Sequence, residues 1–158
     1  PSQPLTACEN GAVGRKIKAI NLRRSDIVTF HSYGRLKRVK KIVSKLREER
    51  GEDIPLVCTE YMARTNGSTF QAILPWFKEQ NIGAVNWGFV RGKSNTIWPW
   101  SSRTSKRGPK ETHPTVPPEE APPEPETWFH DIFRPDHTPY RKEEVELIRR
   151  LTGADNNE

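Results

Sequence analysis

The clearest strand signal in this sequence is Pro55-Leu56-Val57-Cys58-Thr59-Glu60-Tyr61. It is a short apolar run, rich in residues that favour β-structure, and it closes on a carboxylate. A run of this kind predicts a buried parallel strand, and the residue where such a strand stops lies at the carboxyl end of the sheet, where α/β folds keep their chemistry. Glu60 is therefore the first candidate functional residue. The alternative is that Glu60 opens a solvated loop, since Glu is rarely fully buried.

A strand and a helix precede this stretch. Residues 27–30, Ile-Val-Thr-Phe, predict a buried strand that ends in His31-Ser32-Tyr33-Gly34. Residues 35–50 have the period of an amphipathic helix, and Gly51 is expected to end it. The apolar stripe of this helix consists of Leu36, Val39, Val43 and Leu46.

A second helix and a further strand follow the stretch. Ser68 and Gln71 form a predicted capping pair, and Pro75 is expected to bend or shorten the helix. Residues 84–90 predict the next strand. Tyr33, Glu60 and Trp87 are each 27 residues apart, which is the length of one βα unit and favours an α/β fold with a parallel sheet. The residues that this helix is expected to bury are Phe70, Ile73, Leu74 and Phe77.

The two ends of the chain carry weaker signals. Residues 4–8 predict a short strand, and residues 15–22 a basic segment whose apolar side is Ile17, Ile20 and Leu22. Near the other end, Thr138 is expected to cap a last helix that ends at Gly153. The first position of that helix is Pro139, and its expected buried residues are Tyr140, Val145, Ile148 and Leu151.

The sequence divides into four regions by composition. Residues 1–100 hold the βα units, and residues 101–127, with seven of the 14 prolines and several glutamates, predict a loop or insertion. Residues 128–153 form a closing segment and the last helix, and residues 154–158 a frayed tail. The aromatic start of the third region, Trp128 to Phe133, is expected to dock onto the fold.

Composition argues against several classes of function. Two cysteines without paired Cys or His at ligand spacing predict no metal and no cofactor, and no apolar run is long enough to span a membrane. The net charge of +6 permits nucleic-acid binding. However, the basic face of residues 35–50 has no interleaved aromatic residue, and such a face is usually the solvated side of a helix. We therefore expect no nucleic-acid partner.

Three successive strands are expected to bring His31, Tyr33, Glu60 and Trp87 to one end of the sheet. A carboxylate can attack an anomeric carbon, a neighbouring phenol or imidazole can position that carboxylate, and an indole can stack on a pyranose. Each residue also has a purely structural interpretation, His31 as a half-buried histidine and the aromatic residues as core. The residues expected to line the same site for substrate are Arg64, Asn86, Lys93, Trp98 and Trp100.

The segments at 28–33, 55–61 and 84–89 resemble strands six, seven and eight of the retaining glycoside hydrolases of clan A, most of all glycoside hydrolase family five, the cellulase and mannanase group. Residues 128–133, with Pro139-Tyr140 after them, resemble the closing segment of those barrels. The resemblance implies the C-terminal half of a (β/α)8 TIM barrel, with a carbohydrate substrate and a secreted or periplasmic location. It implies that Glu60 is the catalytic nucleophile, that His31 and Tyr33 position it, and that Trp87 is the stacking platform.

The sequence departs from that family in one respect. The family's acid/base is a Glu that follows an Asn on strand four, and no Asn-Glu pair stands at a predicted strand end here. Retention of configuration needs two carboxyl groups about 5 to 5.5 Å apart. We therefore expect the N-terminal half of the barrel to be a missing partner and this chain alone to be inactive. The alternative is a non-catalytic carbohydrate-binding or interaction half-barrel.

Overall fold

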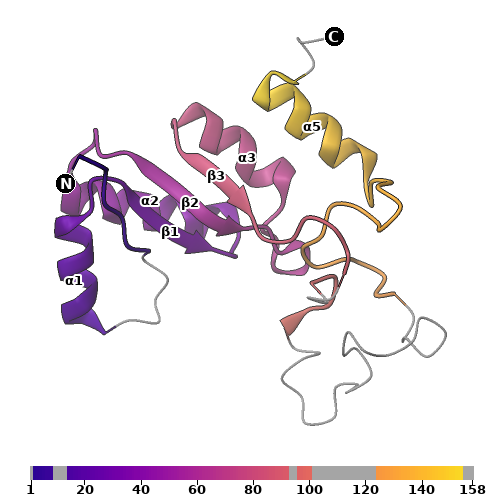
Figure 1. The fold of residues 1–158 in the computed structure, drawn as a ribbon, viewed down its shortest axis with the longest axis horizontal. Coiled ribbons are helices and arrows are strands. Elements are labelled where there is room, and N and C mark those ends of the chain that lie inside the picture. Colours follow the sequence, from indigo (N-terminus) through magenta and orange to yellow (C-terminus); the bar gives the residue numbers. More distant parts are fainter. Residues whose placement is uncertain (1, 9–13, 93–95, 101–123, 155–158) are drawn as a thin grey trace. The chain divides into compact units, whose positions relative to one another are not determined.

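A computed structural model describes residues 2–8, 14–92, 96–100 and 124–154 of the chain (Figure 1). The chain forms two compact units. The first comprises Pro1–Met62 and Asn66–Asn86, and the second comprises Ala63–Thr65 and Trp87–Glu158. None of the helices in the described ranges is long and apolar enough to cross a membrane.

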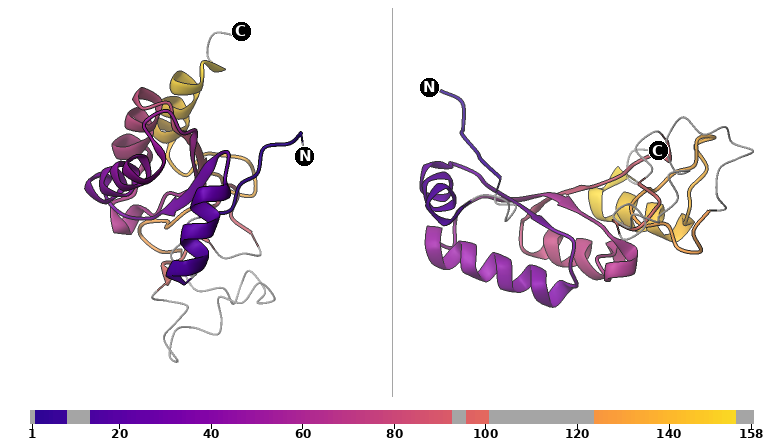
Figure 2. Two further views of the ribbon diagram at one scale, coloured as in Figure 1. Left: turned by 90° about the vertical axis from the view of Figure 1, so that its left-hand side faces the viewer. Right: turned by 90° about the horizontal axis from the view of Figure 1, so that it is seen from below.

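The first unit is built on a parallel sheet of strands β1 (Val28–Ser32), β2 (Leu56–Tyr61) and β3 (Gly83–Asn86), in the order β1-β2-β3. Helix α2 (Leu36–Arg50) connects β1 to β2, and helix α3 (Phe70–Glu79) connects β2 to β3. Both helices lie on the same face of the sheet (Figure 2). The alternation predicted from the sequence is therefore confirmed as an α/β arrangement with a parallel sheet.

The core of this unit lies between the sheet and the two helices. The ring of Phe77 in α3 meets Phe30 edge-on at 6.4 Å between centroids and Tyr61 at 5.5 Å. The aromatic rings prefer such edge contacts because the positive edge of one faces the negative face of the other. The other fully buried apolar side chains from these elements are Val28, Val39, Val43, Leu46, Leu56, Cys58, Phe70 and Ile73.

The ends of the two helices follow the chemistry of capping. Gly51, at φ 97°, ends α2 as predicted. Helix α3 is capped by Thr69, whose Oγ1 accepts a hydrogen bond from the Ala72 amide at 3.3 Å, and not by Ser68. The hydroxyl of Ser68 is buried and accepts a bond from the Met62 amide instead. Pro75 neither ends nor shortens α3, which continues to Glu79 with Phe77 anchored in the core.

The predicted strand at residues 4–8 is wrong. The described part of that segment is not a strand; the Asp26 amide donates to the Leu5 carbonyl at 2.8 Å, and the hydroxyls of Thr6 and Thr29 are 3.0 Å apart. The bonds at Leu5 go to the turn before β1, and the contact with β1 itself is made by side chains, so no ladder of backbone hydrogen bonds forms.

Helix α1 (Arg15–Arg24) replaces the predicted basic segment, but the expected apolar side is only partly correct. Leu22 is buried, whereas Ile17 and Ile20 are 54% and 46% exposed. Two residues along an α-helix are separated by about 200°, so Leu22 faces away from Ile20.

Strand β3 is shorter than predicted. It ends at Asn86, and residues 87–90 leave the sheet, with Val90 forming a single parallel bridge to Phe133. Gly88 lies at φ 87°, in the left-handed region that interrupts an extended strand. The apolar, β-rich composition of this segment did not reveal that interruption.

Within the described residues, the second unit has an aromatic core and the helix α5 (Lys142–Thr152). Trp128, Phe129 and Ile132 are buried, as expected for a segment that docks onto the fold. Helix α5 ends at Gly153 as predicted, but it begins after Arg141 rather than at Thr138, because Thr138 forms a turn with Asp136. Its buried residues are Glu144 and Leu147, while the four that were predicted are half-buried. Residues 101–123 and 155–158, most of the predicted insertion and tail, are outside the described residues.

Candidate functional site

Three predicted site residues meet at the carboxyl ends of β1 and β2. The Tyr33 hydroxyl donates a hydrogen bond of 2.5 Å to Oε2 of Glu60. Nδ1 of His31 lies 3.1 Å from the same oxygen. The side chains of His31 and Glu60 are 22% and 25% exposed, so the cluster is half-buried and open to solvent on one side.

A β-bulge aligns this cluster. Phe30 pairs with Cys58, but the next residue of β1, His31, pairs with Glu60, so Thr59 is skipped in the register. In a regular ladder His31 would lie opposite Thr59, and Glu60 would point to the other face of the sheet. Bulges of this kind are common beside active sites because they redirect one side chain.

In the hydrogen bond between Tyr33 and Glu60, the phenol is the donor and the carboxylate is the acceptor. Burial, and then the hydrogen bond to the Glu60 carboxylate, raise the pKa of Tyr33 well above its ordinary value of 10. Tyr33 therefore stays a neutral phenol that donates to the carboxylate of Glu60. Both contacts fall on Oε2, and Oε1 carries neither of them.

The thiol closest in sequence to this cluster has no nucleophilic role. Cys58 is fully buried, and burial raises its pKa to about 12. A thiol with this pKa is protonated at neutral pH and is not an effective nucleophile.

The predicted substrate-binding residues lie in different places. Asn86 is the last residue of β3 and pairs with Tyr61 in the first unit. Trp87 and Trp100 belong to the second unit and are 43% and 40% exposed, and Trp98 is half-buried there. Lys93 is outside the described residues.

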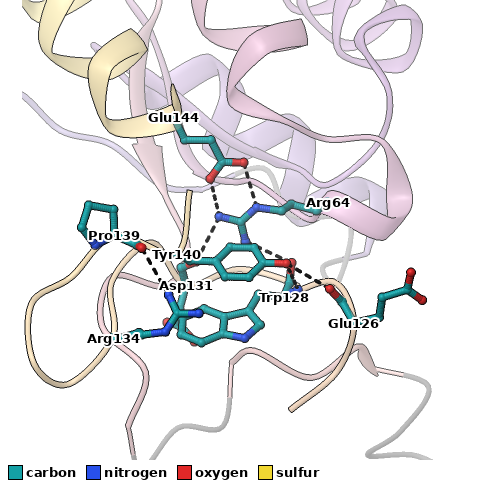
Figure 3. Close-up of polar contacts among 8 residues, drawn as sticks. All are labelled: Arg64, Glu126, Trp128, Asp131, Arg134, Pro139, Tyr140 and Glu144. Carbon is teal, nitrogen blue, oxygen red and sulfur yellow. Dashed lines mark hydrogen bonds and ion pairs between the residues drawn. The ribbon is translucent and has the colours of Figure 1, made fainter. Parts of the chain in front are cut away.

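Arg64 has a structural position that the sequence did not predict. Its guanidinium is buried and forms a two-pronged ion pair with Glu144, through Nε at 2.9 Å and Nη2 at 2.5 Å (Figure 3). Further bonds run from Nη1 to the carbonyl of Trp128 and from Nη2 to that of Asp131. With its hydrogen-bonding groups directed at protein acceptors, Arg64 holds the second unit together rather than contacting substrate.

An aromatic stack lies beside this ion pair. The rings of Trp128 and Tyr140 are parallel within 1° at 4.6 Å, and the guanidinium groups of Arg64 and Arg134 lie over Tyr140 and Trp128 respectively (Figure 3). The partners are up to 80 positions apart, so no local pattern marked Arg64 or Glu144 as a pair. The only available signal in the sequence was that Glu144 belongs to the amphipathic last helix.

Apart from the Glu60 cluster, the possible kinds of site are a metal centre and a cavity. Within the described ranges no group of three or more His, Cys, Asp or Glu could hold a metal ion. A cavity of about 340 Å³ lies at the amino ends of β2 and β3, opposite the Glu60 end, and Arg47, Glu52 and Gln80 are among its lining residues. Comparison with protein families, with curated proteins and with solved structures finds no match to this chain.

Proposed function

We propose that this chain is the C-terminal half of a (β/α)8 barrel from a retaining β-glycoside hydrolase, with Glu60 as the nucleophile. The observation that carries the proposal is the contact of Tyr33 and His31 with one oxygen of Glu60 at the carboxyl end of a parallel sheet. A carboxylate held in this way is fixed in orientation while its second oxygen stays available.

The proposed reaction has two displacements. A carboxylate oxygen of Glu60 bonds to the anomeric carbon as the bond from that carbon to the leaving oxygen breaks. Water then attacks the same carbon, the ester bond to Glu60 breaks, and the carboxylate is regenerated. Tyr33 and His31 act as positioning residues, because they contact the carboxylate.

The leaving oxygen must take up a proton, which requires a second carboxyl group about 5 to 5.5 Å from Glu60. The proposal assigns that group to the N-terminal half of the barrel, which is not part of this chain. Hydrolysis of natural substrates is therefore proposed for the completed barrel and not for this half alone.

The test is covalent labelling of the protein with 2-fluoro β-glycosides that carry an activated leaving group and need little acid assistance. We expect a mass increase on the peptide that contains Glu60, absent in Glu60→Gln and retained in the matched surface variant Glu48→Gln. An adduct on another carboxylate, or one that survives in Glu60→Gln, would contradict the proposal.

A second candidate is carbohydrate binding without turnover. The exposed rings of Trp87 and Trp100 favour it, since exposed indoles can stack on sugars. Glycan binding that quenches tryptophan fluorescence equally in the native protein and in Glu60→Gln, with no labelling of Glu60, would support this candidate instead.

A further inference from the structure

The charges of the first unit are segregated along the strands. From His31 to Arg47 and from Leu56 to Lys78, the only acidic residue is Glu60. The other acids near the sheet cluster at its amino end, in the turns before β1 and β2 or at the ends of α2 and α3, and all are exposed: Asp26, Glu48, Glu49, Glu52, Asp53 and Glu79. In these two ranges the carboxyl end of the sheet, where Glu60 lies, therefore has basic residues and no second acidic residue.

Two of these cations, Arg35 and Arg38, lie at the same end of the sheet as the Glu60 cluster. Arg35 directly precedes α2 and follows Tyr33 by two residues, a distance of at most about 7 Å along the backbone. Its side chain passes the loop after β2, since a Cβ atom on Gly67 would come within 2.8 Å of Cγ of Arg35. Arg38 packs in the same way against Gly34, where a Cβ atom would lie 2.6 Å from its Cδ.

These arginines are exposed, and no carboxylate in the described ranges pairs with either of them. Arg47, Arg64 and Arg91 differ, because each has a carboxylate within ion-pair distance. The stems of Arg35 and Arg38 thus lie against two glycines, and no carboxylate among the described residues neutralises their guanidinium groups.

Their position also opposes helix stability. Cations at the start of a helix are unfavourable because the helix dipole is positive there. Helix α5 follows the favourable rule, with Glu143 and Glu144 in its first turn and arginines in its last, whereas the first turns of α1 and α2 have no acid and carry basic residues.

A cation near Glu60 also opposes the proposed chemistry on a neutral sugar, since the transition state develops positive charge at the anomeric carbon. Anionic groups on the substrate would remove this conflict by pairing with the arginines. Guanidinium groups are well suited to this because they bind carboxylates and sulfates through two parallel hydrogen bonds.

We propose that the substrate is an anionic glycan, whose carboxylate or sulfate groups bind Arg35 and Arg38 beside Glu60. This inference rests on the proposed function and adds the class of substrate to it. Neutral polysaccharides of the same backbone are expected to bind more weakly. The interaction is partly screened at physiological salt, where the Debye length is about 8 Å.

The test compares binding of the full chain to three polymers with one backbone, namely carboxymethyl cellulose, cellulose sulfate and neutral hydroxyethyl cellulose. We expect the two anionic polymers to bind at least about tenfold more tightly than the neutral one, and their ranking identifies carboxylate or sulfate as the ligand. Arg35→Gln/Arg38→Gln should remove this preference, and Arg35→Lys/Arg38→Lys should keep part of it. The matched control Arg24→Gln/Lys45→Gln changes the net charge equally at exposed positions outside the Glu60 end and should keep the preference.

Each contrary result has a distinct meaning. Equal binding of neutral and anionic polymers would overturn the anionic substrate and leave the glycosidase proposal standing. If both double variants lose the preference for anionic polymers equally, the preference depends on the net charge of the protein, and the proposed role of Arg35 and Arg38 is overturned. Tighter binding of a single-stranded oligonucleotide, with the same dependence on Arg35 and Arg38, would overturn it in favour of nucleic acid. Failure of all three polymers to bind, together with no labelling of Glu60, would overturn both proposals.

Discussion

At the scale of single residues, the oxygen Oε2 of Glu60 is the centre of the first unit's chemistry. It accepts a hydrogen bond from the Tyr33 phenol, which burial keeps protonated, and it lies beside the imidazole of His31. His31 is in β1, and Tyr33 directly follows that strand. The residue types at 31, 33 and 60 were evident in the sequence. Their convergence on one oxygen depends on the bulge at Thr59, which no spacing in the sequence indicated.

Replacing Tyr33 tests this arrangement directly. Tyr33→Phe removes the hydrogen bond to Glu60 and keeps the ring, so the carboxylate loses one of its two positioning contacts. We expect the rate of labelling by a 2-fluoro glycoside to fall about 10- to 100-fold, equivalent to about 1.4 to 2.7 kcal/mol. The midpoint of thermal unfolding should change little. Tyr140→Phe, in the second unit, is the control and should label at the native rate; an equal fall there would contradict a specific role for Tyr33.

Gly88 is the other single residue that gives a prediction, because its backbone conformation and its surroundings both favour glycine. It lies at φ 87°, and an added Cβ would approach Cβ of His130 to 2.7 Å and Oδ1 of Asp131 to 2.9 Å. Gly88→Ala should therefore lower the free energy of unfolding by about 2 kcal/mol or more, through backbone strain and crowding together. Chemical denaturation measures this. Gly14→Ala, where no atom lies within 4 Å, should cost under about 0.5 kcal/mol.

At the scale of elements, helices and strands differ in how far local pattern predicts them. Helix α2 and strand β2 have strong periodicity and clear boundaries, and both occur where they were expected. Strand β3 and the start of α5 were misplaced by several residues, because a left-handed glycine and an Asp136–Thr138 turn interrupt patterns that looked continuous. Such interruptions depend on the backbone torsions of one or two residues.

A buried ion pair between Arg64 and Glu144 anchors α5, and this gives a strong prediction. Arg64 and Glu144 have side chains only 2% and 1% exposed. Removing one partner leaves a buried charge, so Glu144→Gln should destabilise the protein by about 3 to 5 kcal/mol. The measurement is denaturant unfolding, followed by the fluorescence of the tryptophans. Glu146→Gln, an exposed position on the same helix, is the control and should change stability by less than about 0.5 kcal/mol.

At the scale of the whole molecule, the buried thiol of Cys58 and the half-buried phenol of Tyr33 make stability depend on alkaline pH. The pKa of Cys58 rises from 9.0 to about 12 on folding, and that of Tyr33 also rises. Above pH 9 the unfolded chain therefore holds fewer protons than the native protein. The stability that these groups contribute is fully present below pH 9 and is lost as pH increases toward 12.

We expect the free energy of unfolding to fall between pH 9 and pH 12, with each group adding up to about 1.4 kcal/mol per pH unit while only the unfolded state is deprotonated. Urea unfolding at a series of pH values measures this slope. Cys58→Ala should make the slope shallower between pH 9 and 12. A native slope that is flat across this range would show that Cys58 is not protected from ionisation.

Local sequence patterns were sufficient to predict the alternation of strands and helices, the buried faces of α2 and α3, and the residue types at the carboxyl end of the sheet. These follow from periodicity and local propensity, which act over a few residues. By contrast, the position of Glu60 opposite His31, the pairing of Arg64 with Glu144 and the exposure of Ile17 and Ile20 in α1 are evident only from the folded structure. The physical reason is that register, ion pairing and burial are set by partners distant in the chain, and their positions are fixed only when the elements pack.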